Sequence, residues 1–217
     1  MDRGDAIVIS GPPPQHVGRG GTKLAGALDD FGLSADGKRC LDAGSSTGGF
    51  TDCLLQRGAA TVHAVDVGHG QLHEKLLVDS RVISMERTDI RALGDELPGV
   101  VFDLVVADLS FISTTRLLPV FQKLLARSGD MVVLIKPQFE AGRSEVSKRR
   151  GIIKDRDIWV RVLHDFIDGA VSAHLEVVDL AISPITGGKG NVEFLGHLRH
   201  GDILESVPHN FPSERSP

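Results

Sequence analysis

The sequence predicts an α/β fold built on one mostly parallel, seven-stranded sheet that ends in an antiparallel hairpin. Three observations support this prediction. Helical and strand-like apolar patterns alternate along most of the chain, a glycine-rich turn joins the first strand to a helix, and the last two strands have no helix between them. A chain of 217 residues is long enough to bury one complete core of this kind.

Apolar periodicity and turn signals give the elements in order. Residues 19–200 are expected to form one domain between a flexible, proline-containing leader, 1–18, and a flexible tail, 201–217. The expected strands are 39–41, 61–66, 82–85, 101–108, 131–136, 175–183 and 192–198. The expected helices are 22–31, 71–78, 113–125 and 156–171, with a further helix beginning near Phe50 and a short one before residue 101.

The turn at residues 42–50 has the sequence Asp-Ala-Gly-Ser-Ser-Thr-Gly-Gly-Phe and follows a short buried strand. Its glycines let the backbone approach a ligand, and the helix that follows presents free amide N–H groups. Because ligands of open α/β sheets bind where the strands end, we predict a nucleotide-sized cofactor site here. The candidate binding residues are Asp42, Gly44, Ser45, Thr47, Gly48, Gly49, Phe50, Asp66, Asp89 and Asp108.

Spacing and charge indicate which cofactor this site takes. A dinucleotide fingerprint needs G-x-G-x-x-G, whereas the next glycine after Gly44 is Gly48. The carboxylate of Asp42 disfavours phosphates and favours a cationic amino-acid ligand, which S-adenosylmethionine provides. Asp66 and Asp89 end the next two strands, where they can meet the ribose hydroxyls and the adenine amino group. A nicotinamide-dependent oxidoreductase is disfavoured by the glycine spacing and by the lack of a Tyr-x-x-x-Lys pair.

Four charged residues are candidates for chemistry at the same edge. Lys136 follows five apolar residues and precedes Pro137, which keeps the backbone extended, so we expect its amine to face the site. Asp108 ends the preceding strand and is expected to be its neighbour. Glu193 opens the last strand and Lys23 lies on the first helix. For these last two residues a solvated surface position agrees equally well with the sequence.

Six ordered segments resemble a known family: residues 18–24, 42–51, 66–72, 107–113, 134–140 and 190–194. They look like the TlyA (hemolysin A) family of FtsJ-like ribosomal RNA 2′-O-methyltransferases, and the similarity spans residues 18–198. The resemblance implies a Rossmann-like fold and methyl transfer from S-adenosylmethionine to a ribose 2′-hydroxyl, typically of cytidine in ribosomal RNA. It also implies that the family's catalytic Lys-Asp-Lys-Glu set falls on Lys23, Asp108, Lys136 and Glu193.

The charges within this resemblance suggest a mechanism. Lys136, when neutral, would take the proton of the ribose hydroxyl, and Asp108 would orient it. Lys23 would stabilise developing negative charge, and Glu193 would complete the hydrogen-bond set. Family members usually carry an N-terminal S4 RNA-binding domain, whereas here a leader of 18 residues precedes the Arg-Gly-Gly segment, and Gly18 stands where the family usually has serine.

Contact with RNA must come from a local patch, because a net charge of −5 argues against a uniformly basic binder. Residues 140–161 hold seven basic residues against four acids and follow the strand that ends at Lys136. The candidate RNA-binding residues are Arg19, Arg143, Lys148, Arg149 and Arg150, and the expected partner is ribosomal RNA or a ribosomal subunit. A solvated loop is the alternative interpretation. Phe111 and Phe139 are either base-stacking or core aromatics.

Other features exclude several function classes. Cys40 and Cys53 lie in apolar patterns, as expected for reduced core thiols of a cytoplasmic protein. The sequence shows no signal peptide and no apolar run of membrane length, which disfavours a membrane-active haemolysin. His69 and His73 lack a third ligand spaced for zinc, so no metal is expected. A noncatalytic module that binds S-adenosylmethionine and RNA is the alternative to an enzyme, and the oligomeric state is not predicted.

Overall fold

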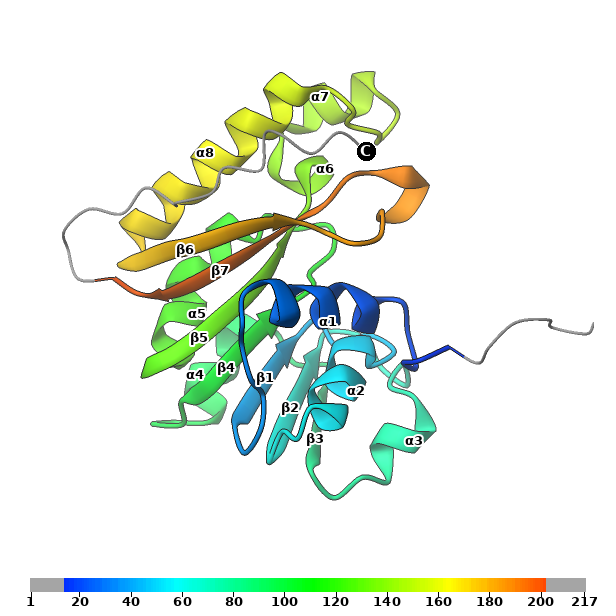
Figure 1. Ribbon diagram of the computed structural model, residues 1–217, viewed down its shortest axis with the longest axis vertical. Helices are drawn as coiled ribbons and strands as arrows, with labels where there is room; N and C mark the ends of the chain where they lie inside the picture. The colour runs from blue at the N-terminus through cyan, green and yellow to red at the C-terminus, as the bar shows by residue number, and fades with distance from the viewer. Residues whose placement is uncertain (1–13, 202–217) are drawn as a thin grey trace, which may run out of the picture.

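Seven strands form a single sheet at the centre of the molecule (Figure 1). The computed structural model describes residues 14–201, except the side chains of residues 143, 144 and 148. The strands are β1 (Arg39–Ala43), β2 (Thr61–Asp66), β3 (Val82–Glu86), β4 (Phe102–Ala107), β5 (Leu125–Ile135), β6 (Leu175–Ile182) and β7 (Phe194–His200). The predicted leader up to residue 13 and the predicted tail from residue 202 lie outside the described residues.

The strands lie in the order β3-β2-β1-β4-β5-β7-β6. Neighbours from β3 to β5 are parallel, whereas β7 pairs antiparallel with both β5 and β6. This confirms the predicted mostly parallel sheet with a terminal hairpin. The sequence does not reveal that β7 enters between β5 and β6. Because Ile135 pairs with Phe194, the residues next to that pair, Lys136 and Glu193, meet at the same edge.

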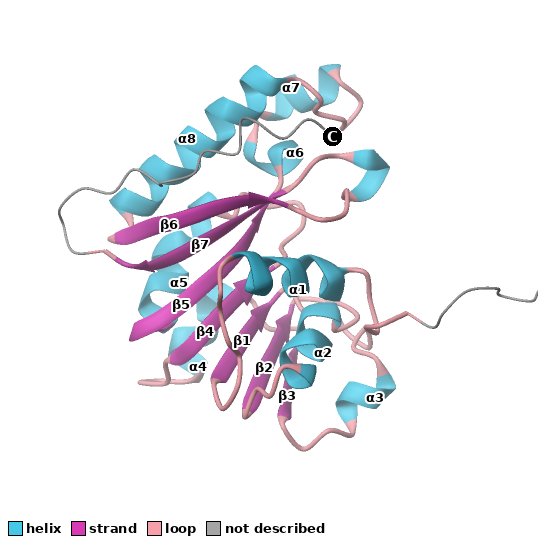
Figure 2. Cartoon of the chain, viewed as in Figure 1, coloured by secondary structure: helices cyan, strands magenta, loops and turns pink. Residues whose placement is uncertain are grey.

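Helices cover both faces of the sheet (Figure 2). They are α1 (Gly20–Asp30), α2 (Gly49–Gln56), α3 (Glu74–Leu77), α4 (Leu93–Glu96), α5 (Leu118–Leu124), α6 (Pro137–Glu140), α7 (Arg143–Lys148) and α8 (Arg156–Ser172). The 3₁₀ turns within residues 14–201 are η1 (Ile90–Ala92), η2 (Thr115–Leu117) and η3 (Gly188–Gly190). One core cluster joins α1, α2 and α3 to one face of the sheet, and a second joins α4, α5 and α8 to the other.

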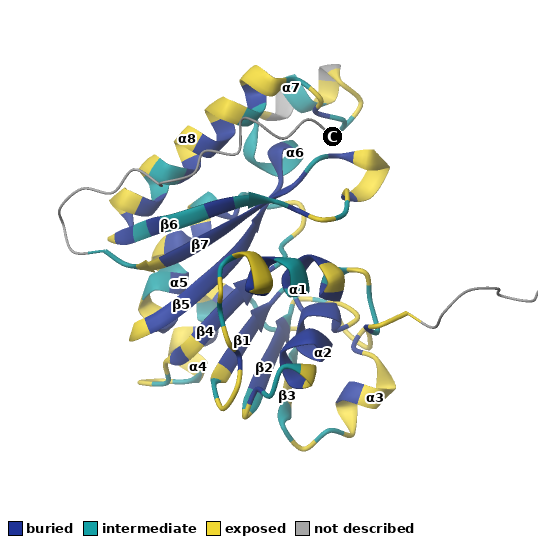
Figure 3. Ribbon diagram, in the orientation of Figure 1, coloured by how far each residue is buried: buried dark blue, intermediate teal, exposed yellow. Residues whose placement is uncertain are grey.

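Alternation along β5 explains the two cores. Val132 and Leu134 face the cluster that includes Leu54 of α2, whereas Met131 and Val133 face the cluster of α5 and α8. All are fully buried, and Figure 3 shows the central strands dark blue between helices whose outer faces are exposed. Each buried aliphatic side chain contributes about 1.5–3 kcal/mol. The two cores therefore hold the strand ends, and the loops that follow them, in fixed positions.

Strand β5 begins at Leu125, six residues before the predicted start. Its register against β4 shifts between Phe102, which pairs with Leu125, and Leu104, which pairs with Asp130. Polar residues occupy this irregular part, so the apolar pattern that marks residues 131–136 does not reveal it. The predicted strand is otherwise confirmed.

Helix lengths differ more from the prediction. The helix expected over 71–78 is limited to α3, because the side chain of His73 caps its first turn by accepting from the backbone N–H of Lys75. The helix expected over 113–125 begins as η2 at Thr115 and ends at Leu124. The basic stretch 140–161, expected to be a loop and a helix start, also contains α7.

Contacts with the domain begin before the predicted boundary at residue 19. His16 is 6% exposed, and the backbone N–H of Val17 donates to Asp52 Oδ2 at 2.9 Å. Gln56 of α2 donates to the carbonyl oxygen of Gln15 at 3.0 Å. Residues 15–18, assigned to the leader from sequence, are therefore part of the packed domain, where they lead directly into the helix that bears Lys23.

Candidate active site at the carboxyl edge of the sheet

The glycine turn after β1 brings three parts of the chain close together. Gly44 has a φ of +82°, and a Cβ there would lie 2.7 Å from the carbonyl oxygen of Asp108. Gly48 caps α2 with a φ of +93°, and a Cβ there would lie 2.1 Å from Leu76. Side chains at either position would force the turn away from its neighbours. The turn consequently lies directly against the end of β4, with the N–H groups of α2 beside it.

Asp42 is fully buried beneath this turn. Its Oδ2 accepts hydrogen bonds from Thr51, from the backbone N–H at 2.9 Å and the hydroxyl at 2.6 Å. Its Oδ1 is also buried and finds no partner among residues 14–201. Burial raises the pKa of Asp42 to about 7, although the bonds from Thr51 act in the opposite direction. The sequence places this carboxylate beside the ligand, whereas the structure places it in the interior, so its contact with a cofactor stays a prediction.

Two further predicted carboxylates line a hollow of about 510 Å³ next to the turn. Asp66 accepts from the backbone N–H groups of Ser46, at 2.8 Å, and Gly68, at 2.7 Å. Asp89 accepts from Arg91 Nε at 2.9 Å, and the hydrogen bonds from Arg91 lower the pKa of Asp89 to about 2. Arg91 is only two residues from Asp89, but the sequence pattern does not identify it as the partner of this carboxylate. The volume is within the range of small-molecule sites.

The four charged candidates come together beside this hollow. Lys136 Nζ lies 2.5 Å from Asp108 Oδ1, and Lys23 Nζ lies 2.6 Å from Glu193 Oε2. The two pairs approach each other, because Lys23 Nζ is 3.9 Å from Asp108 Oδ2. Lys23, Lys136 and Glu193 are less than a tenth exposed, so the alternative of solvated positions for Lys23 and Glu193 is wrong. Two ammonium groups and two carboxylates balance each other in a poorly solvated site.

A smaller hollow of about 270 Å³ gives access to this charged network. Lys23, Asp108 and Lys136 line it together with the turn residues Gly44, Ser45, Ser46, Thr47, Gly49 and Phe50. Exposed Arg19 lies at the same hollow. Most predicted cofactor residues of the turn and three of the four predicted catalytic residues thus line one space, although they come from α1 and from the ends of β1, β4 and β5.

Sequence reasoning missed several residues that complete the network. Lys136 Nζ also donates to the carbonyl oxygen of Leu109 at 2.8 Å and to Ser110 Oγ at 3.3 Å. Gln138 Nε2 donates to Glu193 Oε1 at 3.4 Å. Gln138 lies two residues after Lys136, a spacing that could have drawn attention to it. Leu109 contributes a backbone atom and leaves no side-chain signal.

The basic stretch after β5 is only partly available to a ligand. Arg149 forms an ion pair with Asp155 at 2.9 Å, and Arg161 pairs with Glu145. Arg150 is exposed and has a φ of +53°. Surface pairs of this kind contribute about 0–1 kcal/mol, so a phosphate can compete for Arg149. The side chains of residues 143 and 148 lie outside the described part of the chain, and the roles of all these cations in RNA binding stay predictions.

The two histidines considered as metal ligands each have a different partner within the protein. His69 Nδ1 pairs with Glu86 at 2.8 Å, while His73 caps α3. Residues 14–201 contain no cluster of three His, Cys, Asp or Glu side chains arranged for a metal ion. Within the same residues, none of the helices has both the length and the apolar character needed to cross a bilayer.

A mostly parallel sheet with this terminal hairpin, and with its charged groups gathered around the turn after β1, is the architecture of an α/β methyltransferase. The comparison with known families agrees. Residues 16–200 match the family of FtsJ-like methyltransferases, and the chain belongs to that family.

Similar proteins cover most of the chain. It is 46% identical over 192 residues to the 16S/23S rRNA (cytidine-2′-O)-methyltransferase TlyA of Mycobacterium tuberculosis, covering 88% of this chain and 71% of that protein. It is 46% identical over 189 residues to hemolysin A of Brachyspira hyodysenteriae, covering 85% and 77%. A solved structure named "Putative hemolysin from Streptococcus thermophilus" superposes with a TM-score of 0.85 at 42% identity, covering 94% of this chain and 73% of that one. The resemblance inferred from the motifs is thereby confirmed.

Proposed function

We propose that this chain methylates the 2′-hydroxyl of a ribose in ribosomal RNA, with S-adenosylmethionine as the methyl donor and cytidine as the expected nucleoside. The observation that carries the proposal is the ion pair of buried Lys136 with partly buried Asp108, which faces the same hollow as the glycine turn. The relative named as a cytidine-2′-O-methyltransferase supports the choice of substrate. Such an enzyme works with ribosomes in the cytoplasm, which agrees with Cys40 and Cys53 as free, buried thiols.

The residues around the turn suit S-adenosylmethionine. The cofactor supplies a methyl group activated on a cationic sulfur. Asp66 would accept from the ribose hydroxyls, and Asp89 would meet the adenine amino group in the 510 Å³ hollow. The close-packed backbone at Gly44, together with Ser45, Thr47, Gly48, Gly49 and Phe50, would hold the amino-acid part. The unpartnered Oδ1 of Asp42 supplies negative charge below the turn once that residue is ionised.

Lys136 is the proposed proton acceptor. Its amine can receive the hydroxyl proton when neutral, since the carboxylate of Asp108 and the carbonyl of Leu109 fix its direction. Lys23 would stabilise the negative charge that develops on the ribose oxygen, or the charge of the adjacent phosphate. Glu193 holds the Lys23 amine at 2.6 Å and completes the proposed catalytic set. Burial of Lys23, Lys136 and Glu193 strengthens the interactions of these groups because water is largely excluded.

RNA would approach over the rim of the same edge. Arg19 lies at the charged hollow, and Arg143, Lys148, Arg149 and Arg150 follow the strand that ends at Lys136. Cations in these positions can contact phosphates without reading sequence. Phe111 is 91% exposed, and its ring centroid lies 5.3 Å from that of Phe139. An exposed aromatic side chain next to the site suits stacking on an unpaired base.

The proposal is tested by incubating purified protein with isolated ribosomal subunits and S-adenosylmethionine, and by mapping 2′-O-methylated nucleotides with mass spectrometry. We expect a new 2′-O-methyl group on ribosomal RNA that is absent when the protein is left out. Binding of S-adenosylmethionine without any methyl transfer would instead support the noncatalytic module. Calorimetry that finds tighter binding of a nicotinamide dinucleotide would overturn the methyltransferase assignment altogether.

A further inference from the structure

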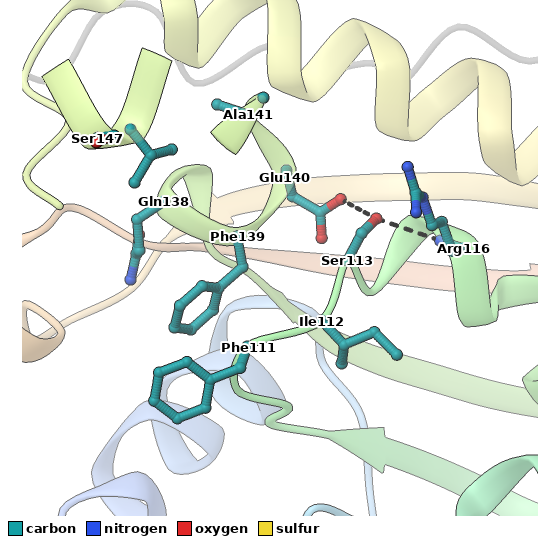
Figure 4. A pocket seen from close by; sticks show the side chains of 11 residues that line it. Phe111, Ile112, Ser113, Arg116, Gln138, Phe139, Glu140, Ala141 and Ser147 are labelled. Atoms are coloured by element: carbon teal, nitrogen blue, oxygen red, sulfur yellow. Dashed lines mark hydrogen bonds between the residues drawn. The ribbon is translucent and has the colours of Figure 1, made fainter. Parts of the chain in front are cut away.

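The carboxylate of Glu140 accepts hydrogen bonds from three consecutive residues. The donors are Ser113 Oγ at 2.6 Å, the backbone N–H of Thr114 at 2.6 Å and Thr115 Oγ1 at 2.9 Å. Figure 4 shows Glu140 pointing toward Ser113 across the pocket wall. Hydrogen bonds to an ionised group are roughly twice as strong as neutral ones. Glu140 therefore fixes the point at which residues 109–115, which we call the β4–η2 segment, enter the helix that follows.

Lys136 holds the other end of the β4–η2 segment. Its Nζ donates to the carbonyl oxygen of Leu109 and to Ser110 Oγ, as described above. Lys136 directly follows β5, and Glu140, four residues later, ends α6, so one short stretch of chain holds both ends of the segment. A shift at the Glu140 end would move the carbonyl and hydroxyl that fix the Lys136 amine.

The middle of the β4–η2 segment is strained. Phe111 has a φ of +65°, a left-handed conformation that side chains larger than glycine avoid. Such a conformation persists only where the surrounding structure imposes it, and it is concentrated at functional sites. Here the two fixed ends impose it. Releasing the Glu140 end would let Phe111 relax toward an ordinary conformation and carry its neighbours with it.

The same segment separates two hollows. Phe111 and Ile112 line both the 510 Å³ hollow that contains Asp66 and Asp89 and an outer hollow of about 620 Å³ (Figure 4). Glu140 itself lines the outer hollow. Displacement of the segment would therefore change the shape of both the 510 Å³ hollow, the proposed cofactor site, and the outer hollow.

We propose that Glu140 is a positioning residue for methyl transfer. It acts through the β4–η2 segment, which its carboxylate holds in the strained arrangement that keeps Leu109 and Ser110 on the Lys136 amine. This inference rests on the proposed function. It predicts an effect on turnover, whereas a carboxylate that merely caps η2 would affect stability alone.

The test is single-turnover methyl transfer to isolated ribosomal subunits at saturating S-adenosylmethionine. Glu140→Ala is expected to lower the maximal rate constant at least about tenfold, because small displacements of a reacting group are costly. The half-saturating concentration of subunits should stay within about threefold of wild type, because Glu140 does not contact RNA in this account. Glu140→Gln keeps an acceptor for Thr114 and an amide that can bond the two hydroxyls, so it should recover most of the rate.

Two control variants separate positioning from stability. Glu145→Ala removes a carboxylate of the neighbouring helix α7, which pairs with Arg161 and not with the segment, so its rate should be that of wild type. Val162→Ala opens a small cavity under α8 and lowers the melting temperature, but it should leave the rate unchanged.

The outcomes distinguish this inference from the function on which it rests. A Glu140→Ala rate within about threefold of wild type, with a lowered melting temperature, would reduce Glu140 to a helix cap. If Glu140→Ala does not fold, the rate of Glu140→Gln tests the inference instead. A Glu140→Gln rate far below wild type, despite a wild-type melting temperature, would contradict the claim that hydrogen bonds to residue 140 position the segment. Wild-type protein that transfers no methyl group would overturn the proposed function together with this inference.

Discussion

Two charge networks lie along β5, one at its middle and one just beyond its carboxyl end, and they use the same residue types differently. At the middle of β5, Asp130 accepts from His197 Nε2 at 2.9 Å, Arg199 Nε at 2.7 Å and Lys38 Nζ at 3.2 Å. Burial acts to raise the pKa of Asp130, but these three donors outweigh it and hold the pKa well below its usual range. One carboxylate thus joins β5 and β7 to the loop before β1.

At the carboxyl end, Asp108 and Glu193 share Lys23 and Lys136, and most of this network lines a hollow. Asp130 is instead closed in by donors from the protein itself. The comparison suggests two roles for such a network. Where donors of the protein occupy all its acceptors, it stabilises the fold, and where it borders space for a ligand, its groups are free to take part in a reaction. Residue type alone does not separate the two cases.

Lys136→Ala should produce the largest effect. We expect the fold and S-adenosylmethionine binding to remain, while methyl transfer falls by about 10²–10⁴-fold, the usual contribution of a general base. Circular dichroism, calorimetry and a methyl-transfer assay on ribosomal subunits measure the three properties. A near-normal rate would mean that the carboxyl-end network is as structural as the one around Asp130.

Asp130→Ala should show the opposite profile. The free energy of unfolding should fall by about 3 kcal/mol, the low end for a broken buried pair, because the side chains of Lys38 and Arg199 are 27% and 51% exposed and keep access to water. Affinity for S-adenosylmethionine should be unchanged. Denaturant titration and calorimetry test both statements, and a stable variant with weakened cofactor binding would invalidate the contrast between the two networks.

The pH dependence of the free energy of unfolding tests the structural role of Asp130, because the direction of the change can be predicted. The pKa of Asp130 is lower in the folded than in the unfolded protein, so its contribution is fully present above about pH 4 and is lost as the pH falls through the folded value. The wild-type free energy of unfolding should therefore decrease below pH 4 more steeply than that of Asp130→Asn. Parallel slopes for the two proteins, from urea titrations between pH 2 and 6, would contradict this.

Asp66→Ala should have a smaller and more local effect. If Asp66 accepts the ribose hydroxyls, its loss weakens S-adenosylmethionine binding by about 1–3 kcal/mol, the cost of leaving such groups unpaired. Calorimetry on the purified protein measures this. Glu86→Ala, which removes a partner of His69 outside the 510 Å³ hollow, is the matched control and should bind normally. Equal affinities for all three proteins would remove Asp66 from the proposed cofactor site.

The smallest effect concerns the basic rim. Lys148, Arg149 and Arg150 changed together to Glu should weaken RNA binding and flatten its dependence on salt, while S-adenosylmethionine binding stays unchanged. Lys123→Glu, an exposed cation near the amino edge, is the control. Filter binding across a range of salt concentrations gives the slopes. An unchanged slope would leave these cations as a solvated surface.

Local signals explain what the sequence could predict. Pro137 and the apolar run before it are enough to place Lys136 at the edge, and the glycine turn is visible in nine residues. The predictions for Asp108 and the terminal hairpin are equally local. What stayed hidden depends on pairing between distant residues: the entry of β7 beside β5, the bond from Glu140 to residues 113–115, and the irregular start of β5 at Leu125.

Asp42 and Asp89 show the same limit within the candidate site. Asp42 lies one residue before the end of β1, and Asp89 lies three residues after the end of β3. Both are near the expected edge, yet Thr51 holds Asp42 in the interior and Arg91 holds Asp89. The partner of Asp89 is two residues away in the sequence, and the partner of Asp42 is nine residues away. Both partners are therefore close enough in the sequence to be considered as donors. Nothing in the pattern shows which donor a carboxylate takes, because that depends on the folded positions of both groups.

Lys136→Arg tests the central claim most directly. Arginine keeps the positive charge beside Asp108 but stays protonated at any usable pH, so it cannot accept the ribose proton. Single-turnover methyl transfer to ribosomal subunits should therefore be lost, about as completely as in Lys136→Ala, while S-adenosylmethionine binding remains. A Lys136→Arg protein that transfers methyl groups at near the wild-type rate would show that Lys136 acts as a positioning cation and that another group accepts the proton.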